Sequence, residues 1–427
     1  MKIDTSPPRG MRDLLPLEVE LRDAAMSRIL GVYRTYGFRR VETPALESLK
    51  LLMGGGGGEN EKLIFKILKR GEKLATSSGD GAAEELADLG LRFDLTVPLA
   101  RYYAHHHARL PHPLRAIQIG PVWRAERPQR GRYRQFTQCD IDILGVESEV
   151  AEVELILATA EALLALGLMD LTVRINDRRL LVSVAERCGF APERFESVFI
   201  GLDKLDKIGL DGVRAELQAA GHHPDAVATL VTLLGEPALG KGQVDDVLRA
   251  LPVDVDGAPA AALRTVIRAV GEASAGRFPL VFDPTLVRGM SYYTGQIFEI
   301  GYKDHPSSIA GGGRYDGMIG RILGRDVPAC GFSIGFERIV AILQEQGGAV
   351  AEPARRLALI FDGARDDLTE VIASAQRLRA EGYLVSVESR SKRLRKQLDD
   401  LAAHGVGLYL VLGETDVRPI GSAVGAS

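Results

Sequence analysis

Two segments place polar side chains at a spacing that would line a binding site for a small cation. Because alternate residues of a strand share one face, LRFDLTV (residues 91–97) would present Arg92, Asp94 and Thr96 together. The same rule applied to RQFTQCDIDIL (residues 134–144) groups on one face Arg134, Phe136, Gln138, Asp140 and Asp142. These groups suit a ligand that carries an ammonium group and a flat ring.

A solvent-facing side of an antiparallel sheet is the alternative, since such a face is ordinarily polar. Two features favour the binding site instead. Lysine and glutamate are missing from both faces, and Phe136 stands among the polar groups without an aromatic neighbour. The pattern alone leaves both interpretations open.

Three later segments carry arginine or glycine where a ligand could approach. In LVRGMSYYTGQIFEI, Arg288 stands beside a glycine and close to two tyrosines, which could equally be ordinary core residues. In SSIAGGGRYDGMIG, Gly311–Gly313 would let the backbone approach a ligand or a neighbouring strand closely. In VPACGFSIGFERIVAIL, Arg338 lies near the start of an apolar helix, where it could form an ion pair or contact phosphate.

Both helices and strands must position these residues. Helical spacing covers residues 17–36 and stops at Gly37, before a short strand-like segment, RRVETPALE. Strand patterns follow over 91–144, helical patterns over 178–275, and strands return over 280–300 and near Gly311 and Phe332, before a helix at about 336–347. The end alternates strands LALIF, YLVSV and LYLVL with helices over about 366–381 and 391–403, as in a small parallel sheet.

We therefore predict a discontinuous mixed domain, an inserted helical domain and a C-terminal α/β domain. Their expected bounds are 1–174 with 276–346, then 175–275, then a short last domain at 354–427. Gly54–Gly58 is expected to be a mobile loop, and no Gly-Lys-Ser/Thr follows to make it a phosphate-binding loop. Residues 75–88 are predicted to be an irregular insertion, and Gly347–Pro353 a linker.

Composition indicates a soluble multidomain protein. The 427 residues are 46% hydrophobic with a net charge of -4, and no signal peptide or membrane-spanning run is apparent, so we expect a cytoplasmic protein with no membrane partner. Cys139, Cys188 and Cys330 lack the paired spacing of disulfides or zinc sites, and His105–His107 lacks a second ligand cluster. We predict no metal bound by protein side chains. Basic clusters at Arg124–Arg134 and Arg390–Lys396 could serve nucleic acid or be solvated faces.

These segments, in this order, resemble the histidyl-tRNA synthetases, and the resemblance runs from PPRGMRDLLP to the last α/β region. VETPALE resembles motif 1 of class II synthetases, whose proline, here Pro44, lies at a dimer interface. VWRAERPQRGRYRQFTQCDID resembles motif 2, and GFSIGFERI resembles motif 3. LVRGMSYYTG and SIAGGGRYDG resemble the two histidine-specific motifs. The resemblance implies an α+β catalytic domain with an antiparallel sheet, an inserted helical domain and a C-terminal anticodon-binding-like α/β domain.

The resemblance also implies a role for each matching residue. Histidine would be bound by Asp94, Leu95, Thr96, Arg124, Gln138, Asp142, Arg288, Tyr292, Tyr293 and Tyr315. ATP, accompanied by Mg²⁺, would be bound by Arg124, Glu126, Arg132, Phe136 and Arg338. Arg124 and Arg288 would be catalytic, and tRNA(His) would be contacted by Arg127, Gln129 and Arg130. A homodimer is expected.

Related chains without the ligase activity are the competing interpretation. The regulatory subunit of ATP phosphoribosyltransferase resembles the synthetase catalytic core but does not activate an amino acid. A more distant alternative is a tRNA-binding or kinase-linked pseudo-synthetase. The C-terminal α/β region argues against the regulatory subunit, and the arginines at 124, 288 and 338 argue against both. The C-terminal domain is expected to stop short of the last strand and helix of longer family members, which leaves its anticodon contacts open.

Overall fold

The computed structural model describes eight stretches of the chain: residues 3–54, 60–70, 86–127, 133–239, 243–288, 292–303, 305–347 and 355–421. Gly55–Gly58, residues 75–85 and residues 348–353 of the predicted loops and linker lie outside the described residues. Within the described residues, Gly54 ends helix α2 (Leu49–Gly54) and residues 87 and 88 begin strand β4 (Ala87–Leu91), so the ends predicted for the first two loops are wrong. Contacts divide the chain into two units. One holds residues 1–13 and 27–342, and the other holds 14–26 and 343–427.

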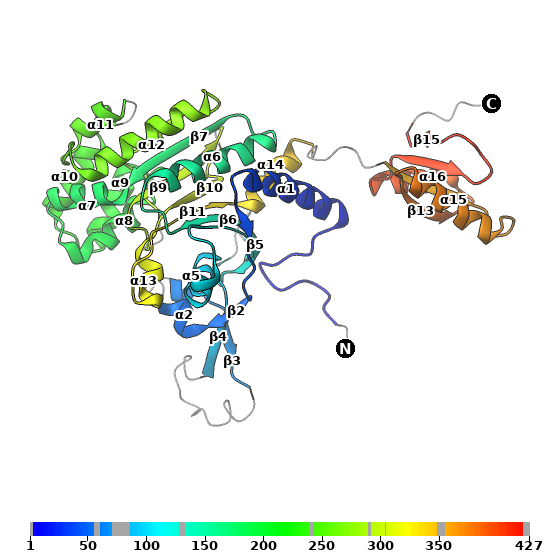
Figure 1. Ribbon diagram of the computed structural model, residues 1–427, viewed down its shortest axis with the longest axis horizontal. Coiled ribbons are helices and arrows are strands. Elements are labelled where there is room, and N and C mark those ends of the chain that lie inside the picture. Colours follow the sequence, from blue (N-terminus) through cyan, green and yellow to red (C-terminus); the bar gives the residue numbers. More distant parts are fainter. Residues whose placement is uncertain are drawn as a thin grey trace. The chain divides into compact units, whose positions relative to one another are not determined.

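An eight-stranded sheet forms the centre of the first unit (Figure 1). Its strands are, in spatial order, β1 (Arg39–Arg40), β5 (Leu114–Trp123), β6 (Gln135–Leu144), β11 (Ala329–Ile334), β10 (Ala310–Arg314), β9 (Gln296–Tyr302), β7 (Leu171–Asp177) and β8 (Leu280–Phe282). All pairs from β5 to β7 are antiparallel, and only the two edge strands pair in parallel. The predicted α+β fold with an antiparallel sheet is confirmed.

The apolar face of this sheet is covered by helices. On β6, Cys139, Ile141 and Ile143 alternate with the polar residues and are fully buried. Helix α6 (Val150–Ala165) packs against β6, β10 and β11, and α12 (Ala258–Ser274) packs against α6. The polar residues of β6, Asp140 and Asp142, are also buried. Both faces of the strand are therefore covered, and a solvent-exposed polar face is excluded for residues 139–144.

The predicted strand over residues 91–97 is wrong. Strand β4 (Ala87–Leu91) ends where that strand should begin, and α5 (Thr96–His106) starts five residues later. A carboxylate oxygen of Asp94 accepts a hydrogen bond from the backbone of Val97 at 3.1 Å. Aspartate and threonine stabilise helix starts in this way, and Pro98 is tolerated in a first turn, so local capping overrides the alternation.

Smaller elements pack near β4 and α5. β4 pairs with β2 (Leu46–Ser48) and β3 (Lys66–Leu68) in a three-stranded sheet. The remaining short elements there are α2 (Leu49–Gly54), η1 (Asn60–Leu63), η2 (His107–Arg109) and α13 (Gly317–Leu323), which packs against α5. Helix α1 (Pro16–Thr35) ends before Gly37, whose φ of 78° is the left-handed conformation that glycine favours.

Residues 178–275 are mostly helical, as predicted. They form α7 (Arg178–Arg187), η3 (Pro192–Arg194), α8 (Phe195–Leu202), α9 (Leu205–Ala219), α10 (Pro224–Leu234), η4 (Pro237–Leu239), α11 (Val244–Ala250) and α12. Figure 1 shows these green helices gathered beside β7. The expected strand over 280–300 exists only as β8 and β9. Asp283 begins a turn between them by accepting the backbone N–H of Thr285 at 2.9 Å.

The second unit contains the predicted β–α repeat. β13 (Leu384–Ser389), β12 (Arg356–Phe361) and β14 (Leu408–Val411) pair in parallel, and β15 (Arg418–Pro419) adds an antiparallel edge. Helices α15 (Leu368–Ala380) and α16 (Leu394–Ala403) cover opposite faces, since alternate residues of β12 pack with Val371 and with Leu398. Helix α14 (Phe336–Glu345) precedes this region. In the described stretches, no helix is long and apolar enough to cross a bilayer.

Candidate active site

One row of directly opposed residues crosses five strands of the large sheet, and most of its members are polar. Strand register sets Asp140 opposite Gln118 on β5 and opposite Ser333 on β11. The row continues from Ser333 to Gly311 on β10, and from Gly311 to Glu299 on β9. Directly opposed residues point to the same face, so strands far apart in sequence build one polar surface.

Three buried carboxyl groups gather at this surface. Asp94, Asp140 and Asp142 are 2%, 4% and 3% exposed, and each keeps one carboxyl oxygen that no described residue hydrogen-bonds. Burial raises the pKa of Asp94 to about 6 and that of Asp142 to about 7, and it raises the pKa of Asp140 well above its usual range. Buried acceptors are normally satisfied, so the unmet oxygens suit a ligand with hydrogen-bond donors and positive charge.

The other carboxyl oxygens are held in place by the protein. The Tyr315 hydroxyl donates to Asp142 Oδ1 at 2.6 Å, and Gln138 Nε2 donates to Asp140 Oδ2 at 3.3 Å. Gln118 Nε2 donates to the carbonyl oxygen of Leu95 at 2.8 Å. Leu95 itself is buried, and its carbonyl oxygen is the group that joins this hydrogen-bond network.

Tyrosine rings stand beside these carboxyl groups. The centroids of Tyr292 and Tyr293 are 4.8 Å apart, and those of Tyr292 and Tyr315 are 6.0 Å apart. All three rings are buried. Thr96 adds a hydroxyl at the start of α5, beside Tyr292. The predicted tyrosines and Asp142 are thus brought together, with Tyr315 as the bridge.

Arg124 lies between Asp94 and Phe136, the aromatic residue that we predict to bind ATP. Its Nε donates to the carbonyl oxygen of Phe93 at 3.0 Å, and its guanidinium lies 5.1 Å from the centre of the Phe136 ring. The positive charge also acts to lower the pKa of Asp94, although burial dominates there. An arginine held between a carboxylate and a half-buried aromatic ring can contact an anionic ligand beside a cationic one.

Glycines make room for two of the site's charged groups. A Cβ on Gly311 would lie 2.5 Å from Arg288 Cζ, and a Cβ on Gly331 would overlap Asp142 Oδ1. Gly312 instead faces the backbone of Gly331 on the neighbouring strand. The predicted close approach at Gly311–Gly313 is confirmed, to a neighbouring strand and to a protein side chain.

Other predicted residues lie at the margin or outside the described stretches. Arg338 on α14 is exposed and donates to the Ser308 carbonyl oxygen. Glu126 is half-buried, with its backbone carbonyl accepting from Arg134 at 3.0 Å, and Arg127 is exposed. Gln129, Arg130 and Arg132 fall outside the described residues.

Several residues of the site were not among those predicted from the sequence. Asp140 was on the predicted polar face, and its burial beside Asp142 places it in the cluster. Ser333 and Gly331 lie on β11, whose partner β6 is distant in sequence, and Glu299 lies opposite Arg174 of the equally distant β7. Gln118 lies on β5, which neighbours β6 in both the sequence and the sheet. Alternation within IQIG and IFEI could have marked Gln118 and Glu299 as lone polar residues on apolar strands.

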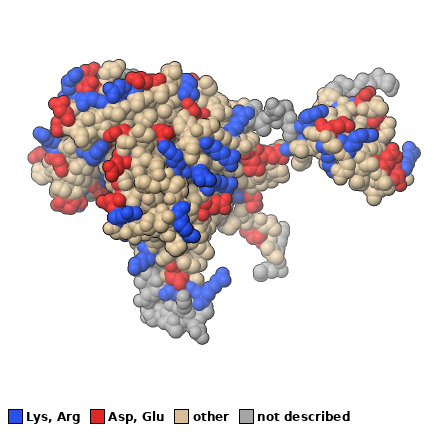
Figure 2. Space-filling view, viewed as in Figure 1, with Lys and Arg blue, Asp and Glu red and all other residues tan. Residues whose placement is uncertain are grey.

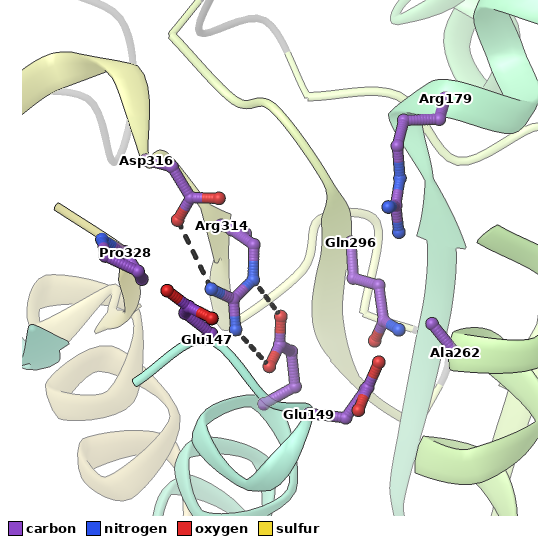
Figure 3. Close-up of a pocket in the computed structure, with 9 residues that line it drawn as sticks. Glu147, Glu149, Arg179, Ala262, Gln296, Arg314, Asp316 and Pro328 are labelled. Atoms are coloured by element: carbon purple, nitrogen blue, oxygen red, sulfur yellow. Dashed lines mark hydrogen bonds and ion pairs between the residues drawn. The ribbon is translucent and has the colours of Figure 1, made fainter. Parts of the chain in front are cut away.

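A separate charged pocket lies at the far end of β10 (Figure 3). Arg314 there forms a two-pronged ion pair with Glu152, at 2.6 and 2.8 Å, and contacts Asp316 at 3.2 Å. Since Arg314 directly precedes Tyr315, this pairing fixes the end of the strand from which Tyr315 reaches Asp142. Among the described residues, no group of three or more His, Cys, Asp or Glu side chains is arranged to hold a metal ion.

Known proteins that are similar to this chain belong to one family. The family model described as histidyl-tRNA synthetase matches residues 10–339. A protein of Leifsonia xyli subsp. xyli named histidine–tRNA ligase is 49% identical over 409 residues, covering 94% of this chain and 93% of that protein.

Solved structures agree at the level of the fold. The crystal structure of histidyl-tRNA synthetase from Nostoc sp. PCC 7120 matches with a TM-score of 0.76 and 28% identity, covering 97% of this chain and 92% of that one. A Bacillus halodurans protein titled an ATP phosphoribosyltransferase regulatory subunit/histidyl-tRNA synthetase matches with a TM-score of 0.74, 96% and 98% coverage, and 22% identity, which speaks for the fold alone. From the family model and the 49% identical relative together, the chain belongs to the histidyl-tRNA synthetase family.

Proposed function

We propose that this protein is a histidine–tRNA ligase. It activates L-histidine with ATP to give histidyl-adenylate and pyrophosphate, and then transfers histidine to the 3′ end of tRNA(His). The observation that carries this proposal is the buried cluster of Asp94, Asp140 and Asp142, each with an unmet carboxyl oxygen, beside three tyrosine rings. Histidine offers an ammonium group for the carboxylates and an imidazole ring for the tyrosines.

The histidine side of the site uses the predicted residues. Asp94, Thr96 and Asp142, with Gln138 nearby, bind the ammonium group, and the backbone at Leu95 borders it. Tyr292, Tyr293 and Tyr315 surround the imidazole. Discrimination follows because a buried polar group that must hydrogen-bond a ring nitrogen is left unpaired by phenylalanine.

The ATP side relies on arginines rather than on a protein nucleophile. A histidine carboxylate oxygen attacks the α-phosphorus in line and forms the new P–O bond. The bond from that phosphorus to the bridging oxygen of the β-phosphate breaks, and pyrophosphate leaves with its electron pair. Arg124 and Arg288 stabilise the charge that develops on the α-phosphate oxygens. Phe136 stacks on adenine, Glu126 contacts its edge, and the remaining phosphate and base contacts come from Arg132 and Arg338.

Magnesium accompanies the nucleotide rather than residing in the protein. Asp94, which acts on Arg124, and Glu299, which pairs with Arg288, are buried, and the described residues hold no group of three or more His, Cys, Asp or Glu side chains arranged for a metal ion. Mg²⁺ therefore binds chiefly through phosphate oxygens and water, and supplies neutralisation of the β- and γ-phosphates.

The tRNA side is assigned by family position. Arg127, Gln129 and Arg130 contact the acceptor end, residues 175–275 form a helical domain inserted into the catalytic domain (1–174 and 276–346), and residues 354–427 form the anticodon-binding domain. The protein acts as a homodimer with Pro44 at the interface. It works in the cytoplasm, where translation consumes charged tRNA.

Exchange of labelled pyrophosphate into ATP, without tRNA, tests the first half-reaction. We expect exchange that depends on L-histidine and is not supported by phenylalanine. A regulatory relative of ATP phosphoribosyltransferase would bind histidine and give no exchange. That outcome, or comparable exchange with phenylalanine, would overturn the proposal.

A further inference from the structure

Arg288 enters the site from irregular backbone, so other residues must orient its guanidinium. It follows β8 and lies outside any helix or strand. Its side chain is 27% exposed and rests on β10, where Cζ and both terminal nitrogens lie 2.5 to 2.6 Å from the position a Gly311 Cβ would take. A long side chain on an irregular segment has many rotamers, and contact with a glycine does not select one.

Glu299 supplies a fixed contact for this guanidinium. It sits on β9 directly opposite Gly311, and its side chain is 8% exposed. Its Oε2 accepts from Arg288 Nη1 at 3.4 Å. Partial burial acts to lower the pKa of Arg288, but Tyr293, Glu299 and Asp203 more than offset it, so the guanidinium stays charged.

A second arginine fixes Glu299 from the other side. Arg174 on β7 lies opposite Glu299 in the sheet and pairs with its Oε1. Arg174 also contacts Asp283 at 2.9 Å and Asp206 of α9 at 3.1 Å. One Glu299 oxygen is thereby occupied, and the other is left to Arg288.

Because Glu299 is shared between Arg174 and Arg288, it orients Arg288 without binding all of the N–H groups of that guanidinium. A two-pronged arginine–carboxylate pair would engage two of its N–H groups. Here the contact with Glu299 is single and long, and Arg288 Nε is buried with no hydrogen-bond partner in the described part of the chain. The unused donors are what an anionic ligand would need.

We infer that Glu299 is a positioning residue for Arg288 during adenylate formation, anchored by Arg174. The inference rests on the proposed function, in which Arg288 stabilises charge at the α-phosphate. Glu299 then acts only through Arg288. It affects the rate of adenylate formation more than the binding of histidine, because orientation counts most where charge develops.

Single-turnover adenylate formation by Glu299→Gln tests this inference. The substitution keeps the shape of the side chain and removes its charge. We expect the rate to fall about 10- to 100-fold, the scale for misplacing a catalytic group, while KM for histidine changes much less. Glu47→Gln is the matched control, because Glu47 on β2 is also buried and pairs with Arg101 of α5 at 2.7 to 2.9 Å. That variant should lose thermal stability without slowing adenylate formation.

A double-mutant cycle separates positioning from general stabilisation. In an Arg288→Ala background, adding Glu299→Gln should change the rate by less than about twofold, because the group that Glu299 orients is already gone. A wild-type rate in Glu299→Gln would overturn the inference, and so would an equal loss in both backgrounds. Absence of histidine-dependent activity in the unmodified protein would instead refute the proposed function.

Discussion

Three buried carboxyl groups define the histidine side of the site, and their burial has a cost. Asp94, Asp140 and Asp142 each lose water without gaining a full set of partners. A buried unpaired charge destabilises a fold, so these groups stabilise the protein only when a cation joins them. We therefore expect substitutions here to move binding and stability in opposite directions.

Asp142→Asn should weaken the binding of histidine and leave the binding of ATP unchanged. The change keeps an acceptor for Tyr315 but removes the charge-assisted partner of the ammonium group, worth on the order of 1.5 to 3 kcal/mol. That corresponds to a rise in KM for histidine of about 10- to 150-fold in pyrophosphate exchange. Equal losses for histidine and ATP would contradict the assignment.

The same variant should be more stable than the wild-type protein at alkaline pH. The pKa of Asp142 is raised to about 7, so between pH 4 and 7 the folded state holds a proton that the unfolded state has lost. Its contribution to the free energy of unfolding therefore falls as pH rises through this range. In urea unfolding, the free energy of unfolding of Asp142→Asn should exceed that of the wild-type protein by a few kcal/mol at pH 8, and the difference should vanish near pH 4. A constant difference across pH would rule out titration of Asp142.

At the scale of elements, strand alternation predicted one half of the site and failed on the other. Residues 135–144 form the long strand β6 within a sheet, so side chains two apart do share a face. Over residues 91–97 the same alternation was misleading, because Asp94 caps the turn before α5. Asp94 still reaches the cluster, but by helix-capping geometry that alternation does not describe.

Gly331 on β11 gives a prediction about strand packing. Gly331→Ala would place a methyl group on Asp142 Oδ1, so we expect Asp142 to move and KM for histidine to rise at least about tenfold, with about 1 to 3 kcal/mol lost in stability. Gly271→Ala on α12 is the control, because nothing lies within 4 Å of its Cβ position. It should gain about 0.5 to 1 kcal/mol and keep its activity. Unchanged histidine kinetics in Gly331→Ala would place Asp142 outside the binding site.

The segment between β5 and β6 carries the prediction for tRNA. Replacing Arg127 and Arg130 together by alanine should lower aminoacylation and flatten its salt dependence, since two phosphate contacts would be lost. Pyrophosphate exchange should stay near the wild-type rate. Parallel losses in both assays would show that these arginines serve ATP instead.

At the scale of the whole molecule, the sequence was enough to predict the order of elements but not their pairing. Helices over 178–275 and the β–α repeat after 356 follow from local periodicity, and both are present. The row from Gln118 through Asp140 to Glu299 depends on register between strands whose paired residues are up to about 190 positions apart, which no local pattern contains. The domain boundaries, the dimer and the role of the C-terminal domain stay predictions.

Charging of a tRNA(His) transcript tests the central claim most directly. The purified protein, ATP, Mg²⁺ and transcript would be incubated with labelled L-histidine or labelled phenylalanine, and acylation of the 3′ end would be followed on acidic gels. The proposed function predicts histidyl-tRNA that depends on ATP, with no detectable phenylalanyl-tRNA. Histidine binding without any acylated tRNA would contradict it.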